Sequence, residues 1–272
     1  MTAGELESLV EGLLTGRDGA VLELVIDRPK AKGSLNDDVV AALIRALEHA
    51  STDQTLRAVL LRSSGDDFCS GFDIVGRNAG SPERPRTGSI QRRLPLQAHR
   101  LVPLLVHLQL PVVCAVRGWA VGIGAQLAVA SDHTVVAQDA KLWWPFVDRG
   151  FTPDSASTWL VPRLVGSVKA RELLLRGRRV DGETAVQWGL VAEATEAHDV
   201  ESTARERAQE LANRATVTLG LTKALLAASA DNSLDRQLEA EAMAMELSSR
   251  SPDFKEGLRA LAERRPADFT GQ

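Results

Sequence analysis

The first two thirds of the chain alternate between short apolar runs and patterns with a helical period. Four runs rich in Val, Leu and Ile have the length and composition of strands: residues 20–27, 57–64, 111–116 and 133–137. Between the first two runs, residues 36–50 carry apolar side chains on one helical face after a capping Asn36 or Asp37. Strands that alternate with helices predict an α/β fold with a mainly parallel sheet.

After Val191 the strand-like runs stop. Three stretches then have the period of helices, and a short tail follows Pro252: residues 200–214, 217–230 and 234–250. The sequence therefore predicts a core of residues 1–199 and a C-terminal helical region of residues 200–272. At the other end, residues 1–14 are acidic and helix-like, lack the basic start of a secretory signal, and precede no apolar run of membrane-spanning length.

Composition limits the partners of the chain. Its 272 residues are 44% hydrophobic, which is enough for a sizeable core, and the formal charge of −4 gives no case for binding nucleic acid or an anionic membrane. Cys69 and Cys114 lie in apolar settings without a metal-binding spacing, which favours a reducing compartment over disulfides. Four histidines form no ligand spacing with one another or with the cysteines: His49, His107, His133 and His198. We expect a cytoplasmic protein without a metal site.

Residues 76–95 interrupt the alternation of strands and helices. The stretch is rich in Gly, Pro, Ser and Arg and has neither a helical nor a strand period. Five arginines make it locally basic: Arg77, Arg84, Arg86, Arg92 and Arg93. We expect a mobile loop, which either covers a phosphate-bearing ligand or is a solvated linker.

A glycine turn follows the third predicted strand. Gly118, Gly122 and Gly124 lead from residues 111–116 into an apolar helical run. Such a turn points backbone N–H groups and the positive end of the helix dipole at one spot, which suits an anion or a developing oxyanion. The G-x-G spacing in the middle of the chain matches a dinucleotide site poorly.

A second turn, residues 65–74, also follows a predicted strand. It places Gly71 beside Phe72 and Asp73 and can supply another N–H group. Its Ser70 lacks the G-x-S-x-G context of a serine nucleophile, so we expect a turn residue there.

Asp154 lies between Pro153 and a run of small residues, just ahead of an apolar segment. Aspartate is a favoured helix N-cap, and Ser155 and Ser157 suit a first turn. From this stretch alone, capping is the simpler interpretation of Asp154, and a catalytic carboxylate is the alternative.

Four motifs together resemble the enoyl-CoA hydratase/isomerase (crotonase) family over nearly the whole chain. They are VIDRPKAKGSLNDDVVAALIRAL, FCSGFDI, PVVCAVRGWAVGIGAQLAVASD and LVGSVKARELLLRGRRVDGETAVQWGLV, and EGLRALAERRPADFTG resembles the family's C-terminal ending. The resemblance implies an α/β fold, a crotonase-like spiral of ββα units with a C-terminal helical trimerisation region. It also implies a homotrimer or a dimer of trimers.

The resemblance further implies an acyl-CoA thioester as substrate, with coenzyme A as part of the substrate and no separate cofactor. The backbone N–H groups of Phe72 and Ile123 would hold the thioester oxygen, on which an enolate charge develops. Both side chains replace smaller residues that are usual in hydratases. Substrate contacts are implied for eight residues: Lys30, Ala31, Ser70, Asp73, Ile74, Gly122, Phe146 and Arg264. Arg264 corresponds to a basic residue that a neighbouring subunit often contributes to CoA.

The chain departs from the hydratases of this family at their two glutamates. Gln126 and Phe146 occupy those places, and neither side chain can take a proton from water. Hydration by two glutamates is therefore disfavoured. Asp154 occupies the place where several isomerases and a dehalogenase of the family carry a catalytic aspartate, which favours catalysis over capping.

A single carboxylate is sufficient to move a double bond from the 3,4 to the 2,3 position. Asp154 would take a proton from C2 and return it at C4, both on one face. Five aromatic residues are expected to raise its pKa and exclude water, with core packing as the alternative, above all for the last: Trp143, Trp144, Phe146, Phe151 and Trp159.

His99 leaves a second chemistry open. It aligns with a histidine of the family's chlorobenzoyl-CoA dehalogenase, in which an aspartate attacks the ring and the histidine activates water. Its apolar helical surroundings favour a packed histidine instead. The isomerase is the leading hypothesis. An atypical hydratase, a hydrolase or dehalogenase with Asp154 as nucleophile, and a non-catalytic acyl-CoA-binding protein are the alternatives, and the sequence does not determine the acyl group.

Overall fold

The structure, a computed structural model, describes residues 5–74, 76 and 86–272. Its main element is a seven-stranded sheet in the order β1-β2-β3-β4-β5-β7-β10. The strands are β1 (Glu7–Val10), β2 (Leu13–Asp18), β3 (Val21–Ile26), β4 (Ala58–Ser63), β5 (Val112–Val116), β7 (His133–Ala137) and β10 (Glu193–Thr195). From β3 to β10 neighbouring strands are parallel, whereas β1, β2 and β3 pair antiparallel. The four predicted strands are confirmed as β3, β4, β5 and β7, but the expectation that strands stop after Val191 is wrong, because the short strand β10 pairs with β7 beyond that residue.

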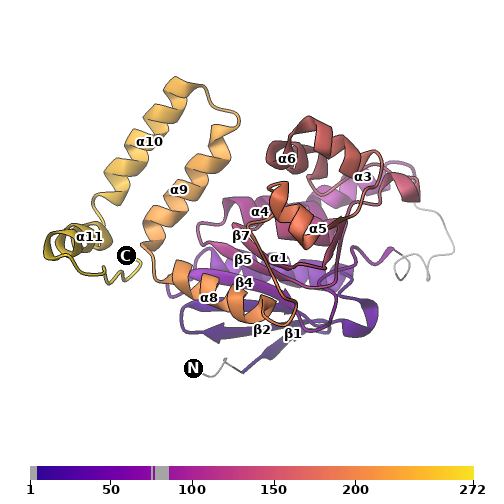
Figure 1. Ribbon diagram of the computed structural model, residues 1–272, viewed down its shortest axis with the longest axis horizontal. Coiled ribbons are helices and arrows are strands. Elements are labelled where there is room, and N and C mark those ends of the chain that lie inside the picture. The colour runs from indigo at the N-terminus through magenta and orange to yellow at the C-terminus, as the bar shows by residue number, and fades with distance from the viewer. Residues whose placement is uncertain (1–4, 75, 77–85) are drawn as a thin grey trace.

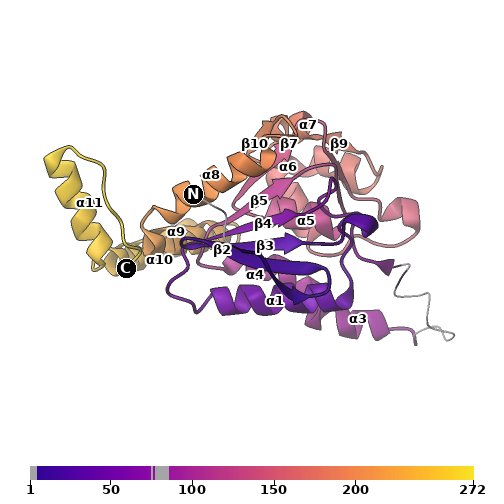
Figure 2. The same cartoon turned by 90° about the horizontal axis from the view of Figure 1, so that it is seen from below.

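Helices cover both faces of this sheet. Figure 2 shows α1 (Asp37–Ala50) and α4 (Leu101–His107) on one side and α8 (Val200–Ala212) on the other. The central strands are consequently buried on both faces, which explains their continuous apolar runs. The Asn36 side chain caps α1 by accepting a hydrogen bond from the Val39 N–H at 2.9 Å, as its sequence predicts.

A second, three-stranded sheet has the order β6-β8-β9. It consists of β6 (Trp119–Val121), β8 (Lys141–Trp143) and β9 (Val180–Asp181). These strands are too short to give a periodic pattern, and the sequence analysis missed them. Strand β6 leads directly into α5 (Ile123–Ala130), with Gly118 before the strand, Gly122 between the two elements and Gly124 inside the helix.

The remaining helices flank these two sheets. In chain order they are η1 (Pro29–Ala31), α3 (Ser89–Arg93), η2 (Leu94–Leu96), η3 (Ala98–Arg100), η4 (Val147–Arg149), α6 (Ser157–Leu174) and α7 (Gly182–Gln187). In the part of the chain that the structure describes, no helix is both long and apolar enough to cross a bilayer. Cys69 and Cys114 are buried and free, consistent with packing residues.

The C-terminal helices extend away from the core (Figure 1). They are α9 (Thr216–Ser229), α10 (Leu234–Ser248) and α11 (Pro252–Glu263). The first two confirm the predicted helical patterns, but the expected short tail after Pro252 is wrong. Ser251 accepts a hydrogen bond from the Phe254 N–H, and Pro252 occupies the first turn, where its missing N–H costs nothing. Both features start a helix.

Two further expectations need correction. The helix-like N-terminal segment forms the strands β1 and β2, because Gly12 turns the chain in a left-handed conformation (φ 94°) and β3 offers an edge for pairing. Of the expected mobile loop, residues 76–95, residues 77–85 lie outside the described residues. The end of that stretch is helical, in α3 and η2.

Candidate active site

Six of the predicted site residues line one cavity of about 440 Å³. Its walls come from the two glycine turns, from the segment around α3 and η2, and from the chain between β8 and α6. The lining includes Phe72, Ile74, Gly122, Ile123, Phe146 and Asp154. A larger cavity of about 840 Å³ between α6, α8 and α9 is lined neither by Asp154 nor by residues of the two glycine turns. The chemistry therefore points to the smaller cavity.

The two glycine turns are tied together by backbone hydrogen bonds. Cys69 donates to the carbonyl of Trp119 at 2.9 Å, and Val121 donates to the carbonyl of Cys69 at 2.8 Å. The approach is so close that a Cβ on Gly124 would lie 2.4 Å from the Cys69 carbonyl oxygen. A glycine is required at this position, and the pairing brings Phe72 and Ile123 to one cavity.

Ile123 begins helix α5 after a sharp turn at Gly122 (φ 55°, ψ −116°). The first N–H groups of a helix have no acceptor within it, and they lie at the positive end of the helix dipole. The start of α5 can therefore stabilise negative charge on an oxygen in the cavity.

Asp154 does not cap α6. The N-cap of that helix is Ala156, which makes no side-chain capping bond, and the Asp154 backbone carbonyl accepts from the Ser157 N–H at 2.9 Å. The capping interpretation is thus wrong for the Asp154 side chain. Asp154 lines the cavity, and its carboxylate accepts a hydrogen bond from Ser155 Oγ at 3.0 Å.

Burial raises the pKa of Asp154 above the usual range of an aspartate. The hydrogen bond from Ser155 and the electrostatic interaction with His99 lower the pKa of Asp154 without cancelling the effect of burial. A raised pKa makes the ionised carboxylate a stronger base than an exposed aspartate.

Gln126 and Phe146 are both buried but have different surroundings. Gln126 is 0% exposed and bonds to Trp144 and Ser155, whereas Phe146 lines the cavity. The ring of Phe146 meets that of Phe151 edge to face, with centroids 5.7 Å apart. The cavity thus presents an aromatic wall near Asp154.

Only two of the five aromatic residues expected around Asp154 line its cavity, namely Phe146 and Phe151. Trp159 lines the larger cavity instead, with the Arg163 guanidinium 4.1 Å from its ring centroid. Trp143 packs beneath the Arg179 guanidinium at 4.2 Å. The sequence analysis placed these rings by proximity along the chain, which does not determine the face on which a side chain lies.

His99 belongs to η3 and is electrostatically coupled to Asp154. Its Nε2 is buried without a hydrogen-bond partner among the described residues. His99 does not itself line the cavity.

The residues expected at the CoA moiety form a separate group. Ser70 Oγ donates to the Ala31 carbonyl at 3.3 Å, while Asp73 pairs with Arg28 at 3.3 Å. Lys30 is exposed in the neighbouring helix η1. These contacts bring the η1 segment next to the turn that carries Phe72.

Arg264 lies apart from this group within one chain. It is exposed at the end of α11, and both views place α11 on the opposite side of the molecule from α3 (Figures 1 and 2). The sequence analysis missed Arg149 and Ser155, which also line the cavity. Neither belongs to a motif, so only the fold could reveal them.

Comparisons with known proteins identify the family of the chain. The family model described as enoyl-CoA hydratase/isomerase matches residues 16–272. The 1,2-epoxyphenylacetyl-CoA isomerase of Escherichia coli (strain K12) is 35% identical over 97% of this chain and 100% of its own. The crotonyl-CoA hydratase of Syntrophomonas wolfei subsp. wolfei (strain DSM 2245B / Goettingen) is 28% identical over 95% of this chain and 98% of its own.

A solved structure extends the similarity to the fold. The crystal structure of an enoyl-CoA hydratase from Polaromonas sp. JS666 superposes with a TM-score of 0.88 at 28% identity, over 94% of this chain and 99% of the other. The motifs, the fold and the family match agree, and the chain belongs to the enoyl-CoA hydratase/isomerase (crotonase) family.

Proposed function

We propose that this chain is an acyl-CoA isomerase that moves a double bond, with Asp154 as its single acid and base. One observation carries the proposal: Asp154 is the only carboxylate among the described residues that line the cavity. The first turn of α5 borders the same cavity. A base and a site for negative charge are the two elements that removal of a proton beside a thioester requires.

The proposed reaction conserves atoms and electrons. Asp154 takes a proton from C2 of a 3-enoyl-CoA, and the electron pair of that C–H bond becomes a dienolate on the thioester oxygen. The N–H groups of Phe72 and Ile123 hold this oxygen. The same carboxylic acid then returns the proton to C4, and the double bond lies between C2 and C3. Fixed amides stabilise the dienolate more than the neutral thioester, which lowers the barrier.

The surroundings of Asp154 argue against hydration. Adding water requires a group that positions and deprotonates it. Both ends of the Gln126 amide are engaged with protein groups, and Phe146 presents only a hydrocarbon ring. One of the relatives is a 1,2-epoxyphenylacetyl-CoA isomerase, and the rings of Phe146 and Phe151 pack together in this cavity. A ring-bearing acyl group is therefore a substrate class worth testing.

The CoA moiety is proposed to lie along η1 and the Phe72 turn. Lys30 and Ala31, with Ser70, Asp73 and Ile74, are the residues of this chain assigned to it, and Gly122 and Phe146 lie nearer the acyl group. Arg264 would come from a neighbouring subunit and pair with a CoA phosphate.

A second candidate function rests on His99. It interacts electrostatically with Asp154, and its Nε2 has no hydrogen-bond partner among the described residues. In this alternative the Asp154 carboxylate attacks the acyl group and displaces CoA thiolate, or attacks a halogenated ring and displaces halide. The first route leaves a mixed anhydride on Asp154 and the second an aryl ester, and a water activated by His99 then hydrolyses either intermediate to regenerate the Asp154 carboxylate.

A panel of CoA esters analysed by mass spectrometry distinguishes these functions. The panel contains a 3-enoyl-CoA, a 2-enoyl-CoA and ring-bearing phenylacetyl-type CoA esters. We expect the 3-enoyl-CoA to change its double-bond position at constant mass in H₂O and to gain deuterium in D₂O. Gain of water would identify a hydratase. Release of free CoA or halide would show that Asp154 acts as a nucleophile. Binding without turnover of any ester would identify an acyl-CoA-binding protein.

We also propose that α9 to α11 mediate assembly into a trimer or a dimer of trimers. Several large apolar side chains on these helices are exposed: Val217, Leu226, Leu234, Leu238, Met243, Met245, Leu247, Leu258 and Leu261. Burying such a surface against another copy is favourable.

Sedimentation at micromolar concentration is expected to give a trimer or a hexamer. The double variant Leu238→Glu, Met245→Glu is expected to shift the population toward monomers, because it places two charges on one apolar face of α10. Glu239→Gln, an exposed change on the same helix, is the matched control. A wild-type monomer at this concentration would contradict the assembly.

A further inference from the structure

We propose that Gln126 is a positioning residue, which fixes the Asp154 carboxylate at the cavity by holding the backbone of the next residue. This inference rests on the proposed role of Asp154 as the acid and base. Hydratases of the family carry a glutamate at the position of Gln126. The proposed role of Gln126 differs from the role of that glutamate, because Gln126 acts through protein groups and touches no substrate.

The Gln126 side chain links three segments of the fold. Its Nε2 donates to the Ser155 carbonyl oxygen at 3.0 Å, and its Oε1 accepts from Trp144 Nε1 at 2.8 Å. Gln126 and Trp144 are both 0% exposed, and Ser155 is 3% exposed. One side chain therefore connects helix α5 to the chain after β8 and to the loop before α6.

The chemistry of the partners determines the orientation of this amide. An indole N–H can only donate, and a backbone carbonyl can only accept. The group between them must offer an acceptor to Trp144 and a donor to Ser155. A neutral side-chain amide does both, whereas an ionised carboxylate cannot donate to the Ser155 carbonyl.

The backbone next to Asp154 needs such a restraint. Ser155 (φ 50°) and Ala156 (φ 62°) are two successive residues in the left-handed region, where side chains other than glycine are disfavoured. Strained backbone of this kind persists only where surrounding contacts determine it. Gln126 holds the Ser155 carbonyl from one side, and the Ser157 N–H holds the Asp154 carbonyl from the other.

The restraint bears directly on the proposed reaction. The carboxylate of Asp154 must reach both C2 and C4 of the substrate, and displacement of a reacting group by about 1 Å costs about 100-fold in rate. The Ser155 side chain also donates to that carboxylate at 3.0 Å. Rotation of the Ser155 backbone would therefore displace the Asp154 carboxylate and would also disturb the hydrogen bond that this carboxylate accepts from Ser155.

The variant Gln126→Glu tests the inference through its pH dependence. When protonated, a glutamic acid donates to the Ser155 carbonyl and accepts from Trp144, so the link survives. When ionised, it presents only acceptor oxygens to that carbonyl and the link is lost. Burial raises the pKa of a glutamic acid at this position, which brings the transition toward neutral pH.

We expect kcat of the wild type to rise with pH through the pKa of Asp154 and then to remain constant. In Gln126→Glu, kcat is expected to rise in the same way and then to fall about 10- to 100-fold at higher pH, with KM little changed. Gln54→Glu, at an exposed position, is the matched control and should follow the wild type. A profile of Gln126→Glu that parallels the wild type at every pH would overturn the inference.

A second variant covers the case in which Gln126→Glu does not fold. Trp144→Phe leaves Gln126 in place but removes one of its two anchors, and it adds no titratable group. We expect kcat to be lower at all pH values, without the additional fall at high pH that is expected of Gln126→Glu. Binding of a CoA ester, measured by calorimetry, should be unchanged. Full wild-type kcat in a folded Trp144→Phe would again contradict the inference. If the wild type itself moves no double bond, the proposed function fails, and the role of Gln126 fails with it.

Discussion

Replacement of Asp154 by asparagine is expected to lower the isomerase kcat by about 100- to 10,000-fold, the range that general acid–base catalysis contributes. The asparagine side chain keeps the shape of the aspartate and an oxygen that can accept from Ser155 Oγ, but it cannot take a proton at ordinary pH. Binding of the CoA ester should be nearly unchanged, because the loss concerns an interaction used in the transition state.

The measurement is double-bond migration and solvent deuterium uptake with a 3-enoyl-CoA, with binding followed by calorimetry. Asp148→Asn is the matched control, since Asp148 is exposed in the nearby helix η4 and does not line the cavity. Near wild-type turnover by Asp154→Asn would assign Asp154 a structural role only.

The pKa of Asp154 also predicts the effect of this variant on stability. Because burial raises that pKa in the folded state, the folded protein binds the proton more tightly than the unfolded chain, and the ionised carboxylate opposes folding at neutral pH. Asp154→Asn is therefore expected to leave the free energy of unfolding unchanged or to increase it. A variant that is inactive and at least as stable as the wild type is the outcome expected of a catalytic group.

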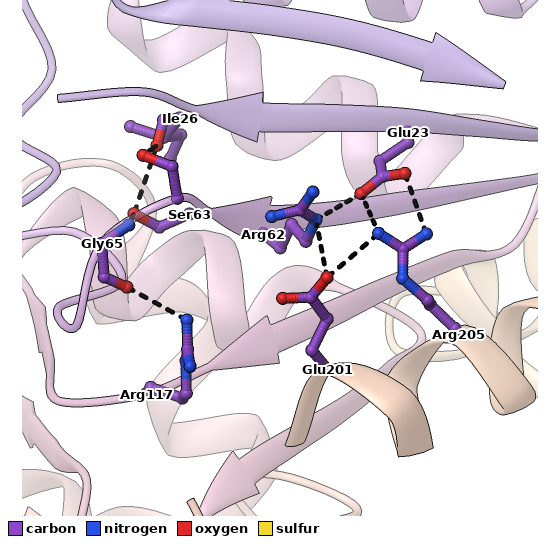
Figure 3. Close-up of polar contacts among 9 residues, drawn as sticks. Glu23, Ile26, Arg62, Ser63, Gly65, Arg117, Glu201 and Arg205 are labelled. Atoms are coloured by element: carbon purple, nitrogen blue, oxygen red, sulfur yellow. Dashed lines mark hydrogen bonds and ion pairs between the residues drawn. The ribbon is translucent and has the colours of Figure 1, made fainter. Parts of the chain in front are cut away.

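Replacement of Glu23 by alanine is expected to lower the free energy of unfolding by about 3–5 kcal/mol, the cost of breaking a buried ion pair from one side. Glu23 is 2% exposed on β3, and its carboxylate accepts from Arg205 of α8 at 2.9 Å and from Arg62 of β4 (Figure 3). Its removal leaves two largely buried guanidinium groups, for which Glu201 is the remaining acidic partner among the described residues.

Urea unfolding at neutral pH measures this loss. Glu210→Ala is the matched control, because Glu210 is 52% exposed in the same helix as Arg205 and its ion pair with Arg214 lies in solvent. A loss in Glu23→Ala no greater than that of the control would show that the buried network contributes little to stability.

The same network predicts a dependence on pH. Burial by itself raises the pKa of Glu23, but hydrogen bonds from Arg205 and Arg62 outweigh burial and leave the pKa below the usual range of a glutamate. The contribution of the ionised Glu23 to stability is therefore complete above the unfolded-state pKa and is lost as the pH falls through the lower folded-state pKa. The difference in stability between wild type and Glu23→Gln should accordingly shrink in acid.

Much of the site could be predicted from the sequence because its signals are local. Each signal lies within a short stretch of the sequence: the glycines of the two turns, the strands before them and the aspartate at position 154. The family resemblance connected these stretches, and hydrogen bonds between the two turns bring Phe72 and Ile123 to one cavity, while their role as oxyanion donors stays a proposal. The role of Asp154 in catalysis stays a proposal, whereas its capping role is excluded by the geometry of α6.

By itself, the sequence determined the parallel strands of the core, the helix after Asn36 and the C-terminal helical region, because continuous apolar strands, a helical period and a capping residue are local patterns. Only the tertiary structure decided that residues 7–18 pair as strands, that β6, β8 and β9 form a second sheet, and that Gln126 bonds to Trp144 and Ser155. In each of these cases the partners are distant in sequence, and their hydrogen bonds and burial outweigh the weak local preference of the segment.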